Sequence, residues 1–202
     1  MITLYLVRHA RSIGNATGRI QGWLDLPLDE LGHRQAGLAA ERLRHKPLAA
    51  IYASPLSRAA QTAQVIADAC GLAVRLDERL REFHMGAWTG LTGEEIQAMM
   101  PRHWDQDPSD HIGPGGESGA DMRVRVDSFL ADMVARHENQ MIAVVCHGGS
   151  LGGIVGAVLG LPPLRRHPFT FGNASITKLT YEHDHWRLRS LNDRCHLHSY
   201  QQ

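Results

Sequence analysis

Short apolar runs alternate along this chain with longer segments in which apolar residues recur at helical spacing. The runs at 2–7, 49–53 and 141–146 are aliphatic and end in polar or charged residues, so they predict buried strands. A shorter run at 74–76 predicts another strand. The alternating pattern that begins at Ser175 predicts a C-terminal hairpin, with strands over 175–181 and 186–191.

Several predicted helices carry recognisable start and stop signals. Ser54 is the expected N-cap of one helix, with Pro55 at its first position and Gly71 near its end. Ser118 is the expected cap of a long amphipathic helix. The predicted helices cover residues 29–44, 55–71, 94–99, 119–134 and 152–159.

The alternation of strands and helices predicts the fold class. We expect a single α/β domain over residues 1–202, built as a three-layer α/β/α sandwich with a mostly parallel central sheet. Glycine and proline interrupt the segment 91–116, which we expect to cover the ligand site and to set its specificity.

Composition and charge narrow the class of protein. The 202 residues include 21 Lys and Arg against 21 Asp and Glu, so no basic field is expected to attract nucleic acid or an anionic membrane. The longest nearly apolar run, 151–161, is shorter than the roughly 20 residues that cross a bilayer. Cys70, Cys146 and Cys195 form no disulfide framework, which together with a first segment unlike a signal peptide favours a cytoplasmic location.

Side chains with affinity for anions follow three of the predicted strands. Arg8 and His9 follow the first, Arg58 lies one turn into the helix after the second, and His147 follows the third. Because ligands bind at the carboxyl ends of parallel strands, these groups should meet at one edge. Guanidinium groups match phosphate oxygens, and histidine can act as a nucleophile, so the sequence predicts an anion pocket suited to phosphoryl transfer.

A leaving alkoxide also needs a proton, so a carboxylic acid is expected near this pocket. Glu82, within LREFHMGAWTG, lies in a loop flanked by glycine between predicted elements. It is the candidate proton donor.

Five sequence blocks in order resemble those of the histidine phosphatase family, also called the phosphoglycerate mutase-like family. The blocks are LYLVRHARSIGN, IYASPLSRAAQTAQVIA, LREFHMGAWTGLT, PGGES and VVCHGGSLGGIV. The resemblance covers nearly the whole chain. It implies a phosphoglycerate mutase-like fold, a phosphohistidine mechanism, and no metal or organic cofactor.

The resemblance also implies a role for each matching residue. His9 would be the nucleophile and Glu82 the proton donor, and a small phosphorylated metabolite would be the substrate. A homodimer is the expected assembly to test. The residues expected to bind the phosphoryl group or the substrate are Arg8, Asn15, Gln21, Gly22, Arg58, His147 and Gly148.

Within the family the sequence favours a phosphatase over a phosphoglycerate mutase. The phosphoglycerate mutases that this chain resembles are typically longer. They have an inserted segment after the proton donor and a Trp-Arg-Arg block. Here Trp104 is followed by Asp105 and Gln106. The natural phosphomonoester is not readable from the sequence, because related enzymes act on different substrates.

Four positions depart from the family pattern. Ala10 replaces the usual glycine, which leaves the backbone carbonyl beside His9 intact. Arg11 replaces a common glutamate, a change that we expect to favour polyanionic substrates. Cys146 replaces serine or threonine, and Gly152 stands where several members carry an arginine that binds a carboxylate.

Two other classes of function compete with this interpretation. Gly148 to Gly152 satisfies the G-x-S-x-G pattern of a serine hydrolase, with Ser150 as nucleophile and Asp184 and His196 as partners. Too little chain follows Ser150 for that fold. A non-catalytic phosphate-binding protein is disfavoured because every expected catalytic residue is present. The His-x-His pairs near the C-terminus are expected to be surface residues rather than metal ligands.

Overall fold

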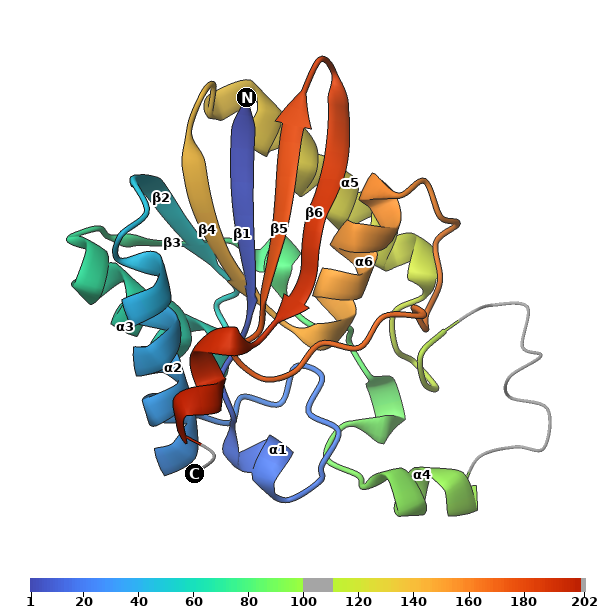
Figure 1. The fold of residues 1–202 in the computed structure, drawn as a ribbon. Helices are drawn as coiled ribbons and strands as arrows, with labels where there is room; N and C mark the ends of the chain where they lie inside the picture. Colours follow the sequence, from blue (N-terminus) through green and yellow to red (C-terminus); the bar gives the residue numbers. More distant parts are fainter. Residues whose placement is uncertain (100–110, 201–202) are drawn as a thin grey trace.

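The computed structural model describes residues 1–99 and 111–200, and side chains as far as residue 197. Its centre is a six-stranded sheet with the order β3-β2-β4-β1-β5-β6 (Figure 1). The first four strands in this order are mutually parallel, whereas β5 and β6 are antiparallel to their neighbours. The strands are β1 (Ile2–Arg8), β2 (Leu48–Ala53), β3 (Val74–Leu76), β4 (Met141–Cys146), β5 (Ile176–Glu182) and β6 (His185–Asp193).

The register of the parallel strands positions the candidate site. Arg8 at the end of β1 pairs with Cys146 at the end of β4, so His9 and His147 leave the sheet side by side. Ala53, the last residue of β2, pairs with Val145 of β4. The chain therefore leaves β1, β2 and β4 at the same edge, as the sequence predicts.

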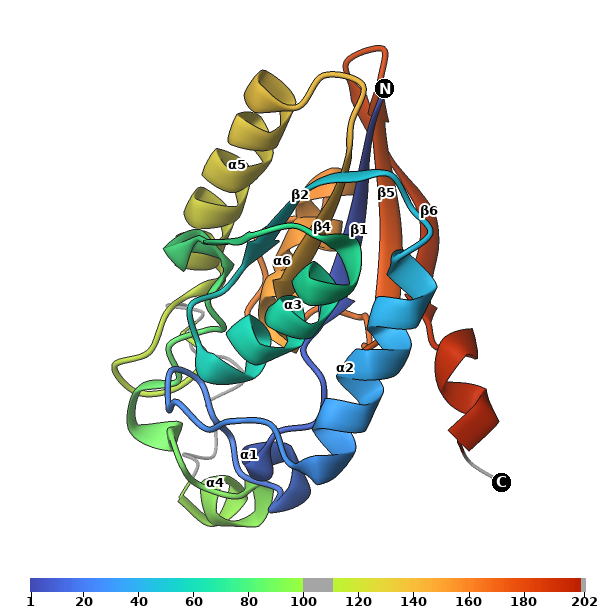
Figure 2. The same cartoon turned by 90° about the vertical axis from the view of Figure 1, so that its left-hand side faces the viewer.

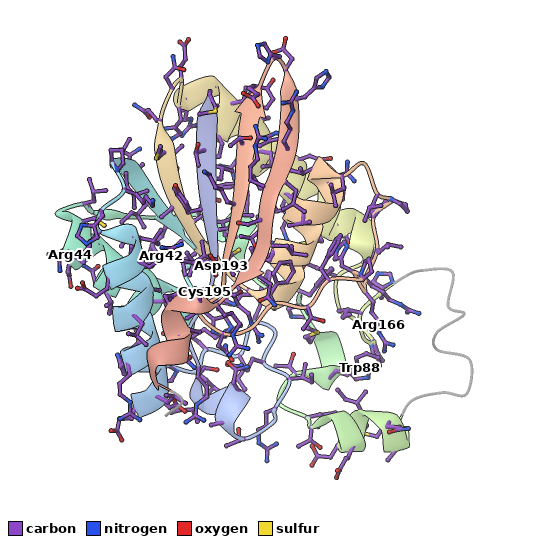
Figure 3. The ribbon with its side chains drawn as sticks, viewed as in Figure 1. Arg42, Arg44, Trp88, Arg166, Asp193 and Cys195 are labelled. Atoms are coloured by element: carbon purple, nitrogen blue, oxygen red, sulfur yellow. The ribbon has the colours of Figure 1, made fainter. Side chains whose placement is uncertain are left out.

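Helices cover both faces of the sheet (Figures 1 and 2). On one face α2 (Glu30–Leu43) and α3 (Ser57–Cys70) pack on apolar residues of β1, β2 and β4. On the other face lie α5 (Gly119–Arg136) and α6 (Gly148–Val158), over a larger apolar cluster. The end of β6 contacts α2, where the guanidinium of Arg42 lies 3.8 Å from the carboxylate of Asp193 (Figure 3). The predicted α/β/α sandwich is confirmed.

The remaining elements are short. They are α1 (Ile13–Ala16), α4 (Gly93–Met99), and the 3₁₀ turns η1 (Glu78–Leu80), η2 (Gly86–Trp88) and η4 (Cys195–Tyr200). The predicted cover segment 91–116 is described only in part, and Trp104, Asp105 and Gln106 lie outside the described residues. Among the helices of the described chain, none has the length and apolar character to cross a membrane.

The starts of two helices differ from their predictions. Ser118 caps α5 through a capping box with Asp121, and Gly71 ends α3 in the left-handed conformation, as predicted. However, Ser54 does not cap α3: the helix begins at Ser57, and the hydroxyl of Ser54 bonds to His147 instead. The range predicted for α6, 152–159, begins too late, because the helix starts at Gly148 with His147 as its N-cap.

Candidate active site

His9 is buried at the end of β1 with a fixed ring orientation. Its Nδ1 lies 2.7 Å from the carbonyl oxygen of Ala10, which can only accept a hydrogen bond. Nδ1 therefore carries the proton, and Nε2 presents an unshared electron pair. The amide of Ala10 in turn donates to the hydroxyl of Thr62 at 3.1 Å. The alanine that replaces the family's glycine thus keeps the carbonyl bond that orients His9.

His147 lies beside His9, with the two ring centroids 5.1 Å apart. The Nε of Arg58 donates to Nδ1 of His147 at 3.2 Å. Since Nδ1 accepts this bond, Nε2 carries the ring proton and donates to the hydroxyl of Ser54 at 2.8 Å. Both ring nitrogens of His147 thus have a protein partner.

Arg58 is a buried cation, only 1% exposed, on the first turn of α3. Its two terminal nitrogens donate to the carbonyl oxygens of Gly22, at 2.8 Å, and Leu24, at 3.0 Å. Burial lowers the pKa of Arg58 to about 10, a change that nearby carboxylates oppose. It remains charged at neutral pH, so a cation is held beside both imidazoles.

Arg8 supplies a second guanidinium to the same edge. Its Nη1 donates to the carbonyl oxygen of Phe171. Its Nε is buried and has no hydrogen-bond partner among the described residues. An unpaired buried donor is costly, so this N–H group is suited to an anion that enters the pocket.

Both histidines are held neutral by their surroundings. Burial lowers the pKa of His9 well below 6.5, and the charges of Arg58 and Arg8 lower it further. Burial likewise lowers the pKa of His147, with Arg58 as the next contributor. A neutral His9 is the form that can attack an electrophile.

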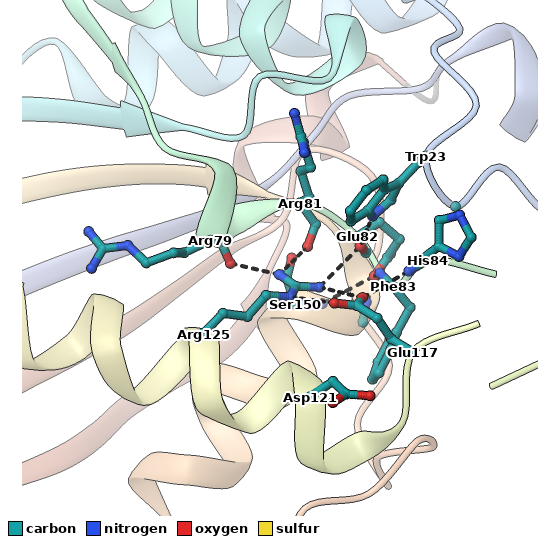
Figure 4. A network of polar contacts seen from close by, with 12 residues as sticks. Trp23, Arg79, Arg81, Glu82, Phe83, His84, Glu117, Asp121, Arg125 and Ser150 are labelled. Atoms are coloured by element: carbon teal, nitrogen blue, oxygen red, sulfur yellow. Dashed lines mark hydrogen bonds and ion pairs between the residues drawn. The ribbon is translucent and has the colours of Figure 1, made fainter. Parts of the chain in front are cut away.

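The carboxylate of Glu82 lies at the N-terminus of α6 (Figure 4). Its Oε2 accepts from the amide of Gly149 at 3.0 Å, and its Oε1 accepts from the amides of Phe83 at 3.0 Å and Ser150 at 3.2 Å. A Cβ atom at position 149 would lie 2.2 Å from Oε1 of Glu82. Glycine at this position therefore permits the carboxylate to approach the helix end.

Two further predicted binding residues, Asn15 and Gln21, belong to the segment that follows His9. Asn15 belongs to α1, where its Oδ1 accepts from the amide of Ser12 at 3.2 Å. The same Oδ1 accepts from Nδ2 of Asn173 at 3.2 Å. Gln21 is buried and accepts from the hydroxyl of Ser12 at 2.8 Å. These contacts fix the loop that follows His9.

Sequence reasoning missed two residues that contact the site, Asn173 and Phe171. Nδ2 of Asn173 donates to the carbonyl oxygen of His9 at 3.1 Å, and Phe171 accepts from Arg8. Both precede β5, which starts at the functional edge because it runs antiparallel to β1. The predicted hairpin was the one signal that could have directed attention to this segment.

Two aromatic residues contact each other beside the Glu82 segment. The indole Nε1 of Trp23 donates to the carbonyl oxygen of Glu82 at 2.7 Å. Its ring meets that of His84 edge-on, with centroids 5.0 Å apart. Trp23 therefore anchors the segment that carries Glu82.

The departures from the family pattern have clear structural settings. The guanidinium of Arg11 lies 2.7 Å from the carboxylate of Asp29, so its charge is paired. Burial raises the pKa of Cys146 to about 12, which leaves an inert thiol. At Gly152, a Cβ would lie 2.6 Å from the ring of His167, so His167 occupies the space that a larger side chain would need.

The serine hydrolase alternative lacks an accessible nucleophile. Ser150 is 0% exposed, and its hydroxyl accepts from the amide of His147 at 3.0 Å as part of the helix cap. A nucleophile elbow instead exposes its serine. Among the side chains that the structure describes, those of residues 1–99 and 111–197, no group of three or more from His, Cys, Asp or Glu is arranged to hold a metal ion.

Comparisons with known proteins show which sequences and folds this chain is similar to. Residues 4–194 match the model of the histidine phosphatase superfamily (branch 1). Phosphoserine phosphatase 1 of Hydrogenobacter thermophilus is 38% identical over 98% of this chain and 95% of its own length. A probable phosphoglycerate mutase GpmB of an Enterobacter species is 40% identical, covering 92% of this chain and 88% of the relative.

Two solved structures are similar over almost their full length. A mycobacterial glucosyl-3-phosphoglycerate phosphatase in complex with VO3 superposes with a TM-score of 0.87 and 36% identity, covering 95% of this chain and 99% of that one. A phosphoserine phosphatase of Entamoeba histolytica in complex with 3-phosphoglyceric acid gives a TM-score of 0.88 and 32% identity, covering 98% and 100%.

Proposed function

Because this chain belongs to the histidine phosphatase superfamily (branch 1), we propose that it hydrolyses a small phosphomonoester through a phosphohistidine on His9. The observation that carries the proposal is the state of His9. Its ring is neutral, its Nδ1 proton is committed to Ala10, and its Nε2 electron pair is free. Two arginines flank it, which is the environment that phosphoryl transfer requires.

In the first step, Nε2 of His9 attacks phosphorus in line with the ester oxygen. The P–N bond forms as the P–O ester bond breaks, and protonated Glu82 gives its proton to the leaving oxygen. In the second step, Glu82 takes a proton from water, which attacks phosphorus and breaks the P–N bond. Inorganic phosphate leaves, and His9 and the protonated Glu82 are restored.

The phosphoryl oxygens are held by donors from several elements. Arg8 offers its unpaired Nε, and Arg58 offers Nε in place of its bond to His147. His147 takes up a proton at Nδ1 and donates to the same anion. The amide of Gly148 adds the positive end of α6. Asn15, Gln21 and Gly22 complete the predicted binding set.

The names of similar proteins support a small phosphate ester as substrate. Those similar proteins include phosphoserine phosphatases and a glucosyl-3-phosphoglycerate phosphatase. The substrates in these names are all phosphomonoesters of small organic molecules. We therefore propose this class of substrate for the chain without choosing one member.

The test is to trap the covalent intermediate. The protein is mixed with p-nitrophenyl phosphate and quenched in alkali, where phosphohistidine survives, and peptides are mapped by mass. We expect nitrophenol release and an acid-labile phosphoryl group on His9, with no label in the His9→Ala variant. Nitrophenol release with no label on His9, or a label on Ser150, would overturn the mechanism.

A phosphoglycerate mutase is the second candidate, favoured by the 40% identity to a protein named as a probable mutase. The two activities differ in the fate of the phosphoryl group. We would incubate the protein with 3-phosphoglycerate in water labelled with heavy oxygen. A phosphatase releases labelled inorganic phosphate, whereas a mutase produces the isomeric phosphoglycerate without label.

A further inference from the structure

Arg125 of α5 binds the main chain around Glu82 through both terminal nitrogens of its guanidinium group (Figure 4). We infer that Arg125 is a positioning residue, which holds the Glu82 carboxylate in the geometry needed to protonate the leaving oxygen. This inference rests on the role proposed above for Glu82. Arg125 itself is not placed in contact with the substrate.

The five N–H groups of Arg125 have five acceptors. Nη1 donates to the carbonyl oxygens of Arg79 at 2.7 Å and Arg81 at 2.6 Å. Nη2 donates to the carbonyl oxygen of Glu82 at 3.1 Å. Nε and Nη2 each donate to the carboxylate of Glu117 at 3.0 Å. One side chain thus binds three carbonyls within four consecutive residues.

Glu117 extends the same support to the other side of Glu82. While it pairs with Arg125, its Oε2 also accepts from the amide of His84 at 2.9 Å. The backbone amide of Glu117 donates to the carbonyl oxygen of His84 at 2.8 Å. The residues on both sides of the Glu82–Phe83 peptide are therefore held by one ion pair.

The segment that carries Glu82 needs such support because it has little regular structure of its own. Glu82 lies between the turns η1 and η2, outside any strand ladder. By contrast α5 is an 18-residue helix with a capping box at Ser118, and it packs into the main core through residues such as Phe129. Through its hydrogen bonds, Arg125 therefore ties the segment that carries Glu82 to the rigid helix α5.

Lysine cannot substitute for this arrangement. An ammonium group has three donors on one atom, whereas the planar guanidinium of Arg125 reaches acceptors on two sides at once. Arg125→Lys keeps the charge and the ion pair with Glu117 but loses most of the carbonyl contacts. The substitution therefore tests geometry rather than charge.

The experiment compares two leaving groups. Phosphoserine releases an alkoxide that needs a proton, whereas p-nitrophenyl phosphate releases a phenolate that is stable without one. Because kcat/KM covers all steps up to formation of the phosphohistidine, it reports on protonation by Glu82. A substitution that merely perturbed the fold would lower kcat/KM for both esters alike.

We expect Arg125→Lys to lower kcat/KM for phosphoserine by about 10- to 100-fold, since small misplacements of a catalytic group have effects of this size. The value for p-nitrophenyl phosphate should fall by less than about threefold. Glu82→Gln should show the same selective pattern, with a larger effect. The double variant should lose no more than Glu82→Gln alone, because both changes remove one function.

Arg123→Lys is the matched control. Arg123 lies on the same helix and forms an ion pair of the same kind, with its Nε 2.7 Å from the carboxylate of Asp127. Its Nη1 donates to the carbonyl oxygen of Leu161 rather than to the Glu82 segment. We expect its ratio of the two kcat/KM values to match the wild type.

A second variant, Glu117→Gln, keeps the inference testable if Arg125→Lys does not fold. Glu117→Gln keeps the shape of the side chain but replaces one accepting oxygen with an NH2 group, so it breaks at least one of the hydrogen bonds that Glu117 accepts and weakens the others. We expect the same selective loss at smaller size. Equal loss on both esters, or an Arg123→Lys effect as selective as that of Arg125→Lys, would overturn the inference. Wild-type protein that neither releases nitrophenol nor forms phosphohistidine would instead remove the proposed function, and the inference with it.

Discussion

The floor of the pocket and the segment that carries Glu82 are built in different ways. The floor is formed by His9, Arg58 and His147. The two histidines directly follow buried parallel strands whose register fixes where they leave the sheet, and Arg58 lies on the first turn of α3. The Glu82 segment has no such ladder and is held by side chains from distant elements, chiefly Trp23 and Arg125. Backbone pairing between strands therefore determines the position of His9, the proposed nucleophile. Polar contacts with residues distant in sequence determine the position of Glu82, the proposed acid.

The largest effect that we expect comes from removing His9, the proposed nucleophile in the floor. We expect His9→Ala to lower kcat by about 10⁴-fold or more on every ester, because no bond to phosphorus can form without the imidazole. Loss should be independent of the leaving group, unlike the effect of changes near Glu82. Steady-state rates on p-nitrophenyl phosphate and phosphoserine measure this, and a loss confined to phosphoserine would contradict the assigned role.

A smaller effect is expected where α6 meets the Glu82 segment. In Gly149→Ala the new Cβ would lie 2.2 Å from Oε1 of Glu82 and 2.6 Å from the ring of Phe83. The carboxylate must move, so we expect kcat/KM for phosphoserine to fall by about 10- to 100-fold, with little change for p-nitrophenyl phosphate.

Gly37→Ala is the control for that substitution. Gly37 also lies within a helix, but nothing lies within 4 Å of the Cβ position. Activity should be unchanged, and the free energy of unfolding should rise by about 0.5 to 1 kcal/mol because alanine favours the helix. If Gly149→Ala affected both esters equally, the close approach at α6 would serve the fold rather than the proposed acid.

The same difference between the floor and the Glu82 segment explains which features of the site could be predicted from the sequence. Apolar runs fix strand ends, and the residues that follow them, such as His9 and His147, could be placed at one edge from the sequence alone. Contacts that a side chain makes with residues far away in the sequence leave no such pattern of apolar and polar positions. Neither the bond from Asn173 to the His9 carbonyl nor the contacts of Arg125 could be read from local spacing.

One error at a helix start has the same origin. Ser54 has the residue type of an N-cap, but its hydroxyl bonds to Nε2 of His147, 93 positions away in the sequence. A tertiary partner therefore overrode the local preference. The range predicted for α6 begins too late because a histidine is an uncommon cap. Here the backbone amide of His147 donates to the hydroxyl of Ser150.

The binding of sulfate, an unreactive dianion, tests whether the imidazole of His147 is neutral before an anion binds. The pKa of His147 is lowered well below 6.5 by burial and by Arg58, whereas an adjacent dianion favours the protonated imidazole. Sulfate binding should therefore take up a proton and weaken as pH rises, by up to about tenfold per pH unit. Calorimetric titrations from about pH 6 to about pH 8 measure this, and an unchanged pH dependence in His147→Asn would contradict the assignment.

The smallest effect expected concerns stability, and it arises from the floor histidines. The pKa values of His9 and His147 are lowered below 6.5 by burial in the folded protein and return towards 6.5 on unfolding. The unfolded chain thus binds more protons below about pH 6.5, so the free energy of unfolding is highest above that pH and falls as pH decreases.

Each floor histidine can contribute up to about 1.4 kcal/mol per pH unit to this slope. Burial also lowers the pKa of His196, so the contributions are separated by comparing variants. Urea unfolding of wild type and His147→Asn between about pH 7.5 and about pH 5 should give a shallower slope for the variant. A slope for His147→Asn as steep as that of the wild type would contradict the assignment of this pH dependence to the floor histidines.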